Sequence, residues 1–161
     1  MTGKCISLLF IIALLLTGGC STFDRDWQAR ADDLVATNRI TGRWQGTWHS
    51  NKTGHGGKLR CIITAQQNAT YLAHYHAIYA KILTYEYTVT FTPSGAGGAS
   101  GGESGGESGG EQFTGKANLG FLAGGVYEYD VSIAGNTFHA TYRCKYDHGQ
   151  FEMIRITDTN P

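Results

Sequence analysis

Residues 125–157 read GVYEYDVSIAGNTFHATYRCKYDHGQFEMIRIT, three short segments in which aromatic or β-branched residues alternate with polar ones. This alternation is typical of β-strands with one buried face. The pair Gly135-Asn136 separates the first two segments and suits a two-residue hairpin turn. That turn would place Tyr129 opposite Tyr142, an aromatic cross-strand pair of the kind that stabilises a sheet.

The same hairpin places Glu128 opposite Arg143 on its other face. A second two-residue turn is predicted at His148-Gly149, within Asp147 to Gln150. Both hairpins bury the same face of the middle segment, and a one-residue slip would invert that face. The second turn predicts these pairs: Tyr146 with Phe151, Lys145 with Glu152, Cys144 with Met153, and Tyr142 with Arg155.

Similar segments occur upstream, so the chain from residue 40 onward is predicted to be all-β. Turn residues separate most of the segments, the pattern of an antiparallel meander. Residues 81–83 carry no turn signal, so the third and fourth segments are either one bent strand or two strands joined by an unmarked turn. The expected strands cover residues 41–50, 57–66, 69–80, 84–92, 112–119, 125–133, 136–146 and 150–157.

We expect these strands to form an eight-stranded antiparallel up-and-down barrel. A short helix over residues 25–38 is predicted before it, because this stretch combines helix formers with a mixed charged face. The barrel domain is residues 40–161. It contains a low-complexity Gly/Ser/Glu loop at 94–111, which cannot pack a core.

In the predicted barrel, Trp44 and Arg155 both point inward. Closure would pair the first strand with the last and bring the two residues together. A guanidinium group over an indole ring is a cation–π arrangement worth about 1–2 kcal/mol.

A helix, then Gly42-x-Trp44 on the first strand, with Arg155 packed on that Trp, resembles the lipocalin and calycin superfamily. The resemblance implies an up-and-down barrel that holds a small apolar ligand, and some bacterial members are outer-membrane lipoproteins. The residues expected inside such a barrel, where a ligand would lie, are Trp44, Tyr129, Tyr142, Arg155, His74 and His76.

The two histidines depend on the turn near Gln67-Asn68. A two-residue turn would place His74 and His76 on the inner face with Cys61, a possible set of metal ligands. A three-residue turn would instead bury Tyr71, Tyr75 and Tyr79 and expose both histidines. No fourth ligand stands at a telling spacing, so no metal is predicted.

The chain starts MTGKCISLLFIIALLLTGGC. A positive start, a short apolar run and small residues indicate a secretory signal peptide over residues 1–19. The junction resembles a bacterial lipobox, which implies acylation of Cys20, for example by palmitate, and a lipidated tether and helix over residues 20–39. By the same resemblance, Ser21 after the cysteine points to the outer membrane, facing the periplasm.

Cys61 and Cys144 would remain in a compartment that permits disulfides. A bond between them is possible only near a narrowed end of the barrel, because they stand on non-adjacent strands. Residues 120–125, GFLAGG, would carry Phe121 and Leu122 at a Gly-flanked tip, either packed there or touching a partner.

The sequence has 13 basic and 13 acidic residues, which gives no basis for nucleic-acid binding. No catalytic motif is present, so we expect a non-enzymatic protein without cofactors that binds a small apolar or amphipathic ligand. One alternative is a cavity-free barrel that acts through its surface on an unidentified protein partner. The other is a metal-dependent enzyme using the two histidines.

Overall fold

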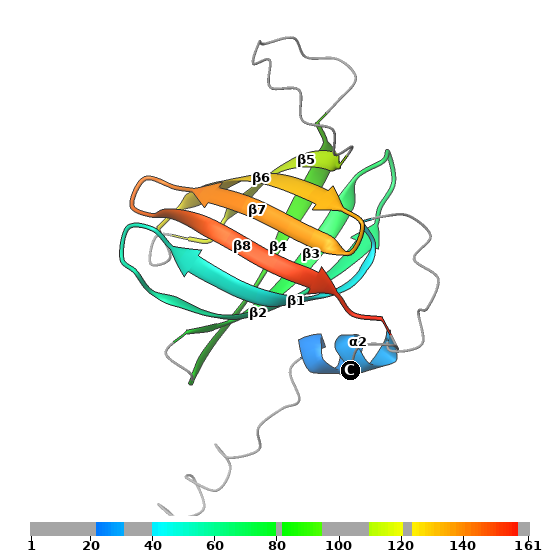
Figure 1. Cartoon of the computed structure of the whole chain (residues 1–161), viewed down its shortest axis with the longest axis horizontal. Helices are drawn as coiled ribbons and strands as arrows, with labels where there is room; N and C mark the ends of the chain where they lie inside the picture. The colour runs from blue at the N-terminus through cyan, green and yellow to red at the C-terminus, as the bar shows by residue number, and fades with distance from the viewer. Residues whose placement is uncertain (1–21, 31–39, 80–81, 95–109, 121–123, 158–161) are drawn as a thin grey trace, which may run out of the picture.

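A computed structural model of the chain describes residues 22–30, 40–79, 82–94, 110–120 and 124–157. Eight strands form a closed antiparallel barrel in which each strand pairs with its sequence neighbours and the last pairs with the first (Figure 1). The predicted fold class is therefore confirmed. The strands are β1 (Gly42–Ser50), β2 (Gly56–Ala65), β3 (Tyr71–Tyr79), β4 (Leu83–Pro93), β5 (Glu111–Asn118), β6 (Val126–Ala134), β7 (Thr137–Arg143) and β8 (His148–Arg155).

The β6–β7 hairpin has the predicted register. Ala134 pairs with Thr137 across the two-residue turn, and Tyr129 pairs with Tyr142. Gly135 has a φ of 58°, in the left-handed region that glycine adopts without steric cost. The local turn residues were sufficient to set this pairing.

The predicted β7–β8 register is wrong by six positions, since Tyr142 pairs with Gly149 and not with Arg155. The strands are joined by residues 144–147, and the Cys144 amide donates a hydrogen bond to the Asp147 carbonyl oxygen at 2.8 Å. An even shift keeps each side chain on its predicted face. Tyr146, predicted to pair with Phe151, lies in this connection and is 54% exposed.

The loop between β2 and β3 is the three-residue alternative. The Gln66 amide donates to the Thr70 carbonyl oxygen at 2.8 Å, and Cys61 pairs with Tyr75. Asn68 and Ala69 both have positive φ values, 58° and 54°, which this loop requires. β3 and β4 are two strands, because Tyr79 pairs with Leu83 across their connection.

Helix α2 (Thr22–Ala29) begins three residues before the predicted helix and lies against the outside of the barrel (Figure 1). Its buried side chains are Phe23 and Trp27, which pack on Ile62 of β2 and on Ile156. None of the helices in the described part of the chain is both long and apolar enough for a membrane span.

One end of the barrel is closed by packed side chains. Trp44 and Ile40 are fully buried there, and the Trp44 indole nitrogen donates to the Ile40 carbonyl oxygen at 2.9 Å. The guanidinium carbon of Arg155 lies 4.3 Å from the centre of the Trp44 ring, as predicted, and Arg155 also donates to the Thr41 carbonyl oxygen. Phe138 packs on the same indole at 5.6 Å.

Barrel closure between β1 and β8 requires glycine at position 46. A Cβ atom there would lie 1.9 Å from the carbonyl oxygen of Glu152 on the paired strand. The two backbones can therefore approach only because Gly46 has no side chain.

Several predictions fall outside the described residues. They are the signal peptide at 1–19, the lipidated Cys20, the later part of the predicted helix at 31–38, most of the low-complexity loop at 95–109, and the tip residues Phe121 and Leu122.

Candidate functional site

The end of the barrel opposite Trp44 is open, and we call it the mouth. It contains a cavity of about 230 Å³, the mouth pocket. Every strand except β5 contributes to its wall, together with the two connections that carry Leu119 and Asp147. The mouth pocket is lined by Trp48, Leu59, Ala77, Tyr79, Tyr85, Tyr87, Leu119, Tyr127, Tyr129, Tyr142, Asp147 and Phe151.

Below this pocket the barrel interior is filled. The largest fully buried side chains there include Trp44, Tyr75, Phe91 and Phe138. Interiors of eight-stranded barrels are either filled or hold one small ligand. This barrel combines the two, with a packed lower half and a small hollow at the mouth.

Aromatic rings form two walls of the mouth pocket. On the β1, β3 and β4 side, Trp48 stacks on Tyr79 with ring centres 6.0 Å apart, and Tyr85 contacts Tyr87 at 5.6 Å. On the β6, β7 and β8 side, the contacts are Tyr127 with Tyr142 at 5.8 Å and Tyr142 with Phe151 at 5.2 Å. Such contacts fix ring positions and make the walls rigid.

Among the described residues that line the mouth pocket, Asp147 is the one acidic residue. Its Oδ1 atom accepts hydrogen bonds from the Ser50 hydroxyl at 2.6 Å and from the His148 amide at 2.8 Å. Its Oδ2 atom accepts one from the Tyr142 hydroxyl at 3.1 Å. These contacts hold the carboxylate in place at the edge of the pocket.

Burial raises the pKa of several tyrosines around this site, because the phenolate form loses its hydration. The pKa values of Tyr129 and Tyr142 are raised mainly for this reason, and a nearby Asp147 raises that of Tyr142 further. The pKa values of Tyr75 and Tyr87 are raised well above the usual range by the same desolvation. These hydroxyls therefore keep their protons to higher pH than an exposed tyrosine does.

Of the predicted interior residues, the structure brings Tyr129 and Tyr142 to the mouth pocket. Trp44 and Arg155 lie at the closed end. They therefore help to close the barrel and do not line the mouth pocket.

His74 and His76 are not in the barrel interior, which corrects the predicted site. The three-residue loop turns both histidines outward, where His74 pairs with Ile62 and His76 with Arg60. Phe23 of α2 packs against both, with ring centres 5.1 Å from each, so His76 is buried and His74 is partly buried. Cys61 faces the core on the other side of the sheet, so the proposed ligand set is not assembled.

Cys61 and Cys144 are both free thiols. Cys61 is fully buried, and desolvation raises its pKa. Cys144 lies in the β7–β8 connection, where its sulfur accepts hydrogen bonds from the amides of Tyr146 and Asp147 at 3.4 and 3.2 Å. The predicted possible disulfide is not formed.

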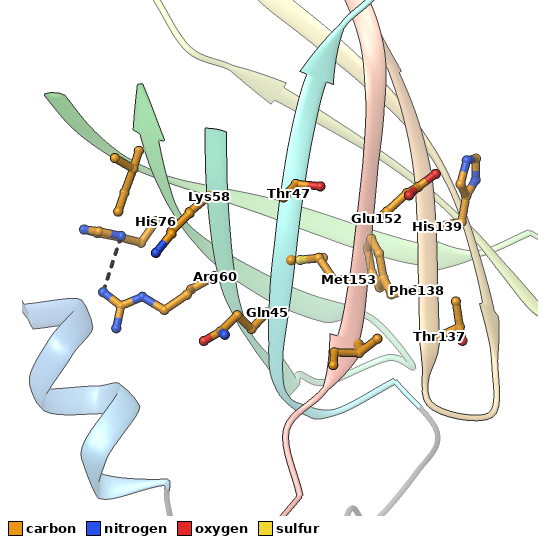
Figure 2. A pocket seen from close by; sticks show the side chains of 13 residues that line it. Gln45, Thr47, Lys58, Arg60, His76, Thr137, Phe138, His139, Glu152 and Met153 are labelled. Atoms are coloured by element: carbon orange, nitrogen blue, oxygen red, sulfur yellow. Dashed lines mark hydrogen bonds between the residues drawn. The ribbon is translucent and has the colours of Figure 1, made fainter. Parts of the chain in front are cut away.

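A larger hollow of about 870 Å³ lies on the outer wall of the barrel, beside α2; we call it the outer groove (Figure 2). Its side chains come mainly from the outward positions of β1, β2, β3, β7 and β8, and they carry both signs of charge. The charged or titratable ones are Lys58, Arg60, His76, His139 and Glu152. Arg60 is already paired with Asp24 of α2 at 2.7 Å, so α2 uses part of this wall.

Sequence reasoning missed Asp147 and the first aromatic wall. Asp147 was assigned to a turn with the wrong register, which hid its contact with Ser50, 97 positions away. Tyr79, Tyr85 and Tyr87 gave a usable signal, because they lie at the ends of neighbouring strands that meet at the mouth. No family model, curated protein or solved structure gives a significant match to this chain.

Proposed function

We propose that the mouth pocket binds a small apolar or amphipathic molecule and that the protein is a non-enzymatic, lipid-anchored protein of the bacterial cell envelope. The mouth pocket carries the first part of this proposal. Ligand sites are concave, mostly apolar, contain a few placed polar groups, and occur in the mouths of barrels. At about 230 Å³ the cavity is smaller than the roughly 300–1,000 Å³ typical of drug-sized ligands, so the ligand is smaller than a typical drug-sized molecule.

The rim of the mouth supports an apolar or amphipathic ligand. Ile82 and Leu83 at the β3–β4 connection are 82% and 59% exposed, and Val126 at the start of β6 is 54% exposed. Large exposed apolar side chains gathered in one place mark interaction sites. Here they lie at the ends of strands on the same side of the barrel as the mouth pocket.

The position of α2 is consistent with the proposed lipid anchor. One residue, Ser21, stands between Cys20 and Thr22, the first residue of the helix, and one residue spans at most about 3.6 Å. Phe23 and Trp27 fix the helix to the barrel. Acyl chains on Cys20 would thus hold the barrel close to the membrane, which we propose is the outer membrane, with the protein facing the periplasm.

Arg155 over Trp44 supports the further proposal that this barrel is related to the lipocalin and calycin superfamily. That relationship would place ligand binding at the open end of the barrel. It would also agree with the proposal that the protein binds a ligand and does not act as an enzyme.

Ligand binding is tested with a blocked pocket. Ala77 lines the mouth pocket, whereas the next residue, Ile78, lines the outer groove. We expect N-phenyl-1-naphthylamine, a neutral apolar dye, to gain fluorescence with the wild-type chain and with Ile78→Phe, but not with Ala77→Phe. Equal dye binding by all three proteins would contradict the proposal. Native mass spectrometry of the gently purified wild-type protein tests it independently, with the added mass of one bound small molecule expected.

Anchoring is tested by metabolic labelling with radioactive palmitate. We expect the wild-type chain and Cys5→Ser to be labelled and recovered with the membranes, and Cys20→Ser to be unlabelled. Label that survives in Cys20→Ser, or is lost from Cys5→Ser, would contradict an anchor at Cys20.

A further inference from the structure

Three of the hydrogen-bond donors that line the mouth pocket are already used by the protein. The Trp48 indole nitrogen donates to the Ile78 carbonyl oxygen at 3.2 Å, and the Tyr85 hydroxyl donates to the Leu119 carbonyl oxygen at 3.1 Å. The Tyr142 hydroxyl donates to Asp147. Tyr85 and Tyr142 can still offer a ligand the lone pairs of their hydroxyl oxygens, and all three side chains can offer the faces of their rings.

Asp147 has acceptor capacity left. An ionised carboxylate can accept about four hydrogen bonds, and Asp147 accepts three, only one of them at Oδ2. None of the ion pairs within the described residues includes it. The neighbouring basic side chains, Lys145 and His148, are exposed, and the Lys145 ammonium group lies over the Tyr146 ring at 5.2 Å.

The described lining of the mouth pocket contains no lysine, arginine or histidine. Two groups of aromatic rings and the Asp147 carboxylate line this small cavity together. Aromatic faces carry negative electrostatic potential and attract cations, most strongly where water is excluded. Acceptors, ring faces and a fixed negative charge all favour the same kind of ligand.

We infer that the ligand of the mouth pocket is an organic cation, a small ammonium compound whose charged group contacts Asp147 and the ring faces of Trp48 and Tyr142. This inference rests on the proposed binding function and names the chemical class of the ligand. The apolar part of the molecule would lie against Leu59, Ala77 and Phe151, which form the aliphatic and aromatic remainder of the wall.

Two probes of nearly the same shape, one charged and one neutral, show how much of the affinity comes from the positive charge. Choline carries a quaternary ammonium group, and 3,3-dimethyl-1-butanol replaces its nitrogen with carbon. We expect choline to bind the wild-type chain at least ten times more tightly than the neutral alcohol in isothermal titration calorimetry. Asp147→Asn keeps the acceptor oxygen for Ser50 but removes the charge, and we expect it to weaken choline binding about tenfold while leaving the alcohol unchanged.

The matched control is Asp130→Asn. Asp130 is an exposed carboxylate on the outer wall that pairs with Arg143 at 3.2 Å, so this variant should bind choline like the wild type. A loss of choline binding in Asp130→Asn equal to that in Asp147→Asn would overturn the assignment to Asp147. If Asp147→Asn does not fold, the comparison of choline with the alcohol on the wild-type chain still decides the inference.

Failure of this inference is distinguishable from failure of the proposed function. Equal affinity for choline and the alcohol, or binding of N-phenyl-1-naphthylamine without binding of choline, overturns the cationic ligand and leaves the binding function standing. If the dye, choline and the alcohol all fail to bind, both are overturned.

Discussion

The Arg155 guanidinium group lies over the Trp44 indole at 4.3 Å and joins the last strand of the barrel to the first. The same side chain donates a hydrogen bond to the Thr41 carbonyl oxygen, just before β1. One side chain thus connects two segments of the barrel that are more than a hundred residues apart in the sequence. The barrel has no free sheet edge at this seam, which removes a site for edge-to-edge association.

Arg155→Met should lower the free energy of unfolding by about 2–3 kcal/mol, because it removes a partly desolvated cation–π contact and a charge-assisted hydrogen bond. Urea denaturation followed by tryptophan fluorescence measures the loss. Arg143→Met is the control, since Arg143 is 63% exposed in its ion pairs and should cause a much smaller loss. Equal losses in the two variants would contradict a special role for Arg155.

Phe23→Ala should lower the free energy of unfolding by about 3 kcal/mol, the lower part of the range for a buried phenylalanine. Phe23 is fully buried between α2 and the outer wall, where it contacts His74 and His76. Arg25→Ala on the same helix is the control, because that side chain is 72% exposed. An unchanged unfolding midpoint for Phe23→Ala would mean that α2 is not docked.

The raised pKa values of Tyr129 and Tyr142 predict destabilisation at alkaline pH. In the unfolded chain a tyrosine loses its proton near pH 10, whereas in the folded barrel it keeps the proton to higher pH. The folded state then binds more protons, so stability is complete below about pH 10 and falls as pH rises above it. Each such tyrosine contributes up to about 1.4 kcal/mol per pH unit above that point.

Thermal melts between pH 8 and pH 12 check this alkaline loss. A parallel titration of phenolate absorbance should lag behind that of a denatured sample, with the buried tyrosines ionising together with unfolding. Superimposable native and denatured titration curves would contradict the raised pKa values.

Thiol accessibility distinguishes the two cysteines of the barrel. In a Cys5→Ser/Cys20→Ser chain we expect Ellman's reagent to modify one thiol in the native state and two after denaturation, because Cys61 is fully buried and Cys144 is half-buried. Adding Cys144→Ser should abolish the native reaction. A native protein with no reactive thiol and a mass two daltons below that of the reduced chain would instead contain the disulfide.

The alternation of apolar and polar residues determined which elements form and which face of each is buried. Side chains in a strand alternate with a period of two, so Trp44, Tyr129 and Tyr142 were placed inside before any tertiary contact was known. The Gly135-Asn136 turn also set a complete hairpin register, because a two-residue turn leaves a single pairing. The contact between Arg155 and Trp44 followed once closure was assumed.

Tertiary structure decided the register of β7 with β8 and the positions of the side chains that contact distant parts of the chain. The β7–β8 pairing differs from the predicted one by six positions. Residues 144–147 form the connection, closed by the hydrogen bond from Cys144 to Asp147, and the distant Ser50 holds the Asp147 side chain there. His76 was buried by a helix from another part of the chain, and Asp147 reached the mouth through Ser50. The sequence by itself thus determined the strands, their inner faces and one turn. Barrel closure and the docking of α2 decided the registers of the longer loops and the side chains that form the site, since both depend on contacts between residues far apart in the chain.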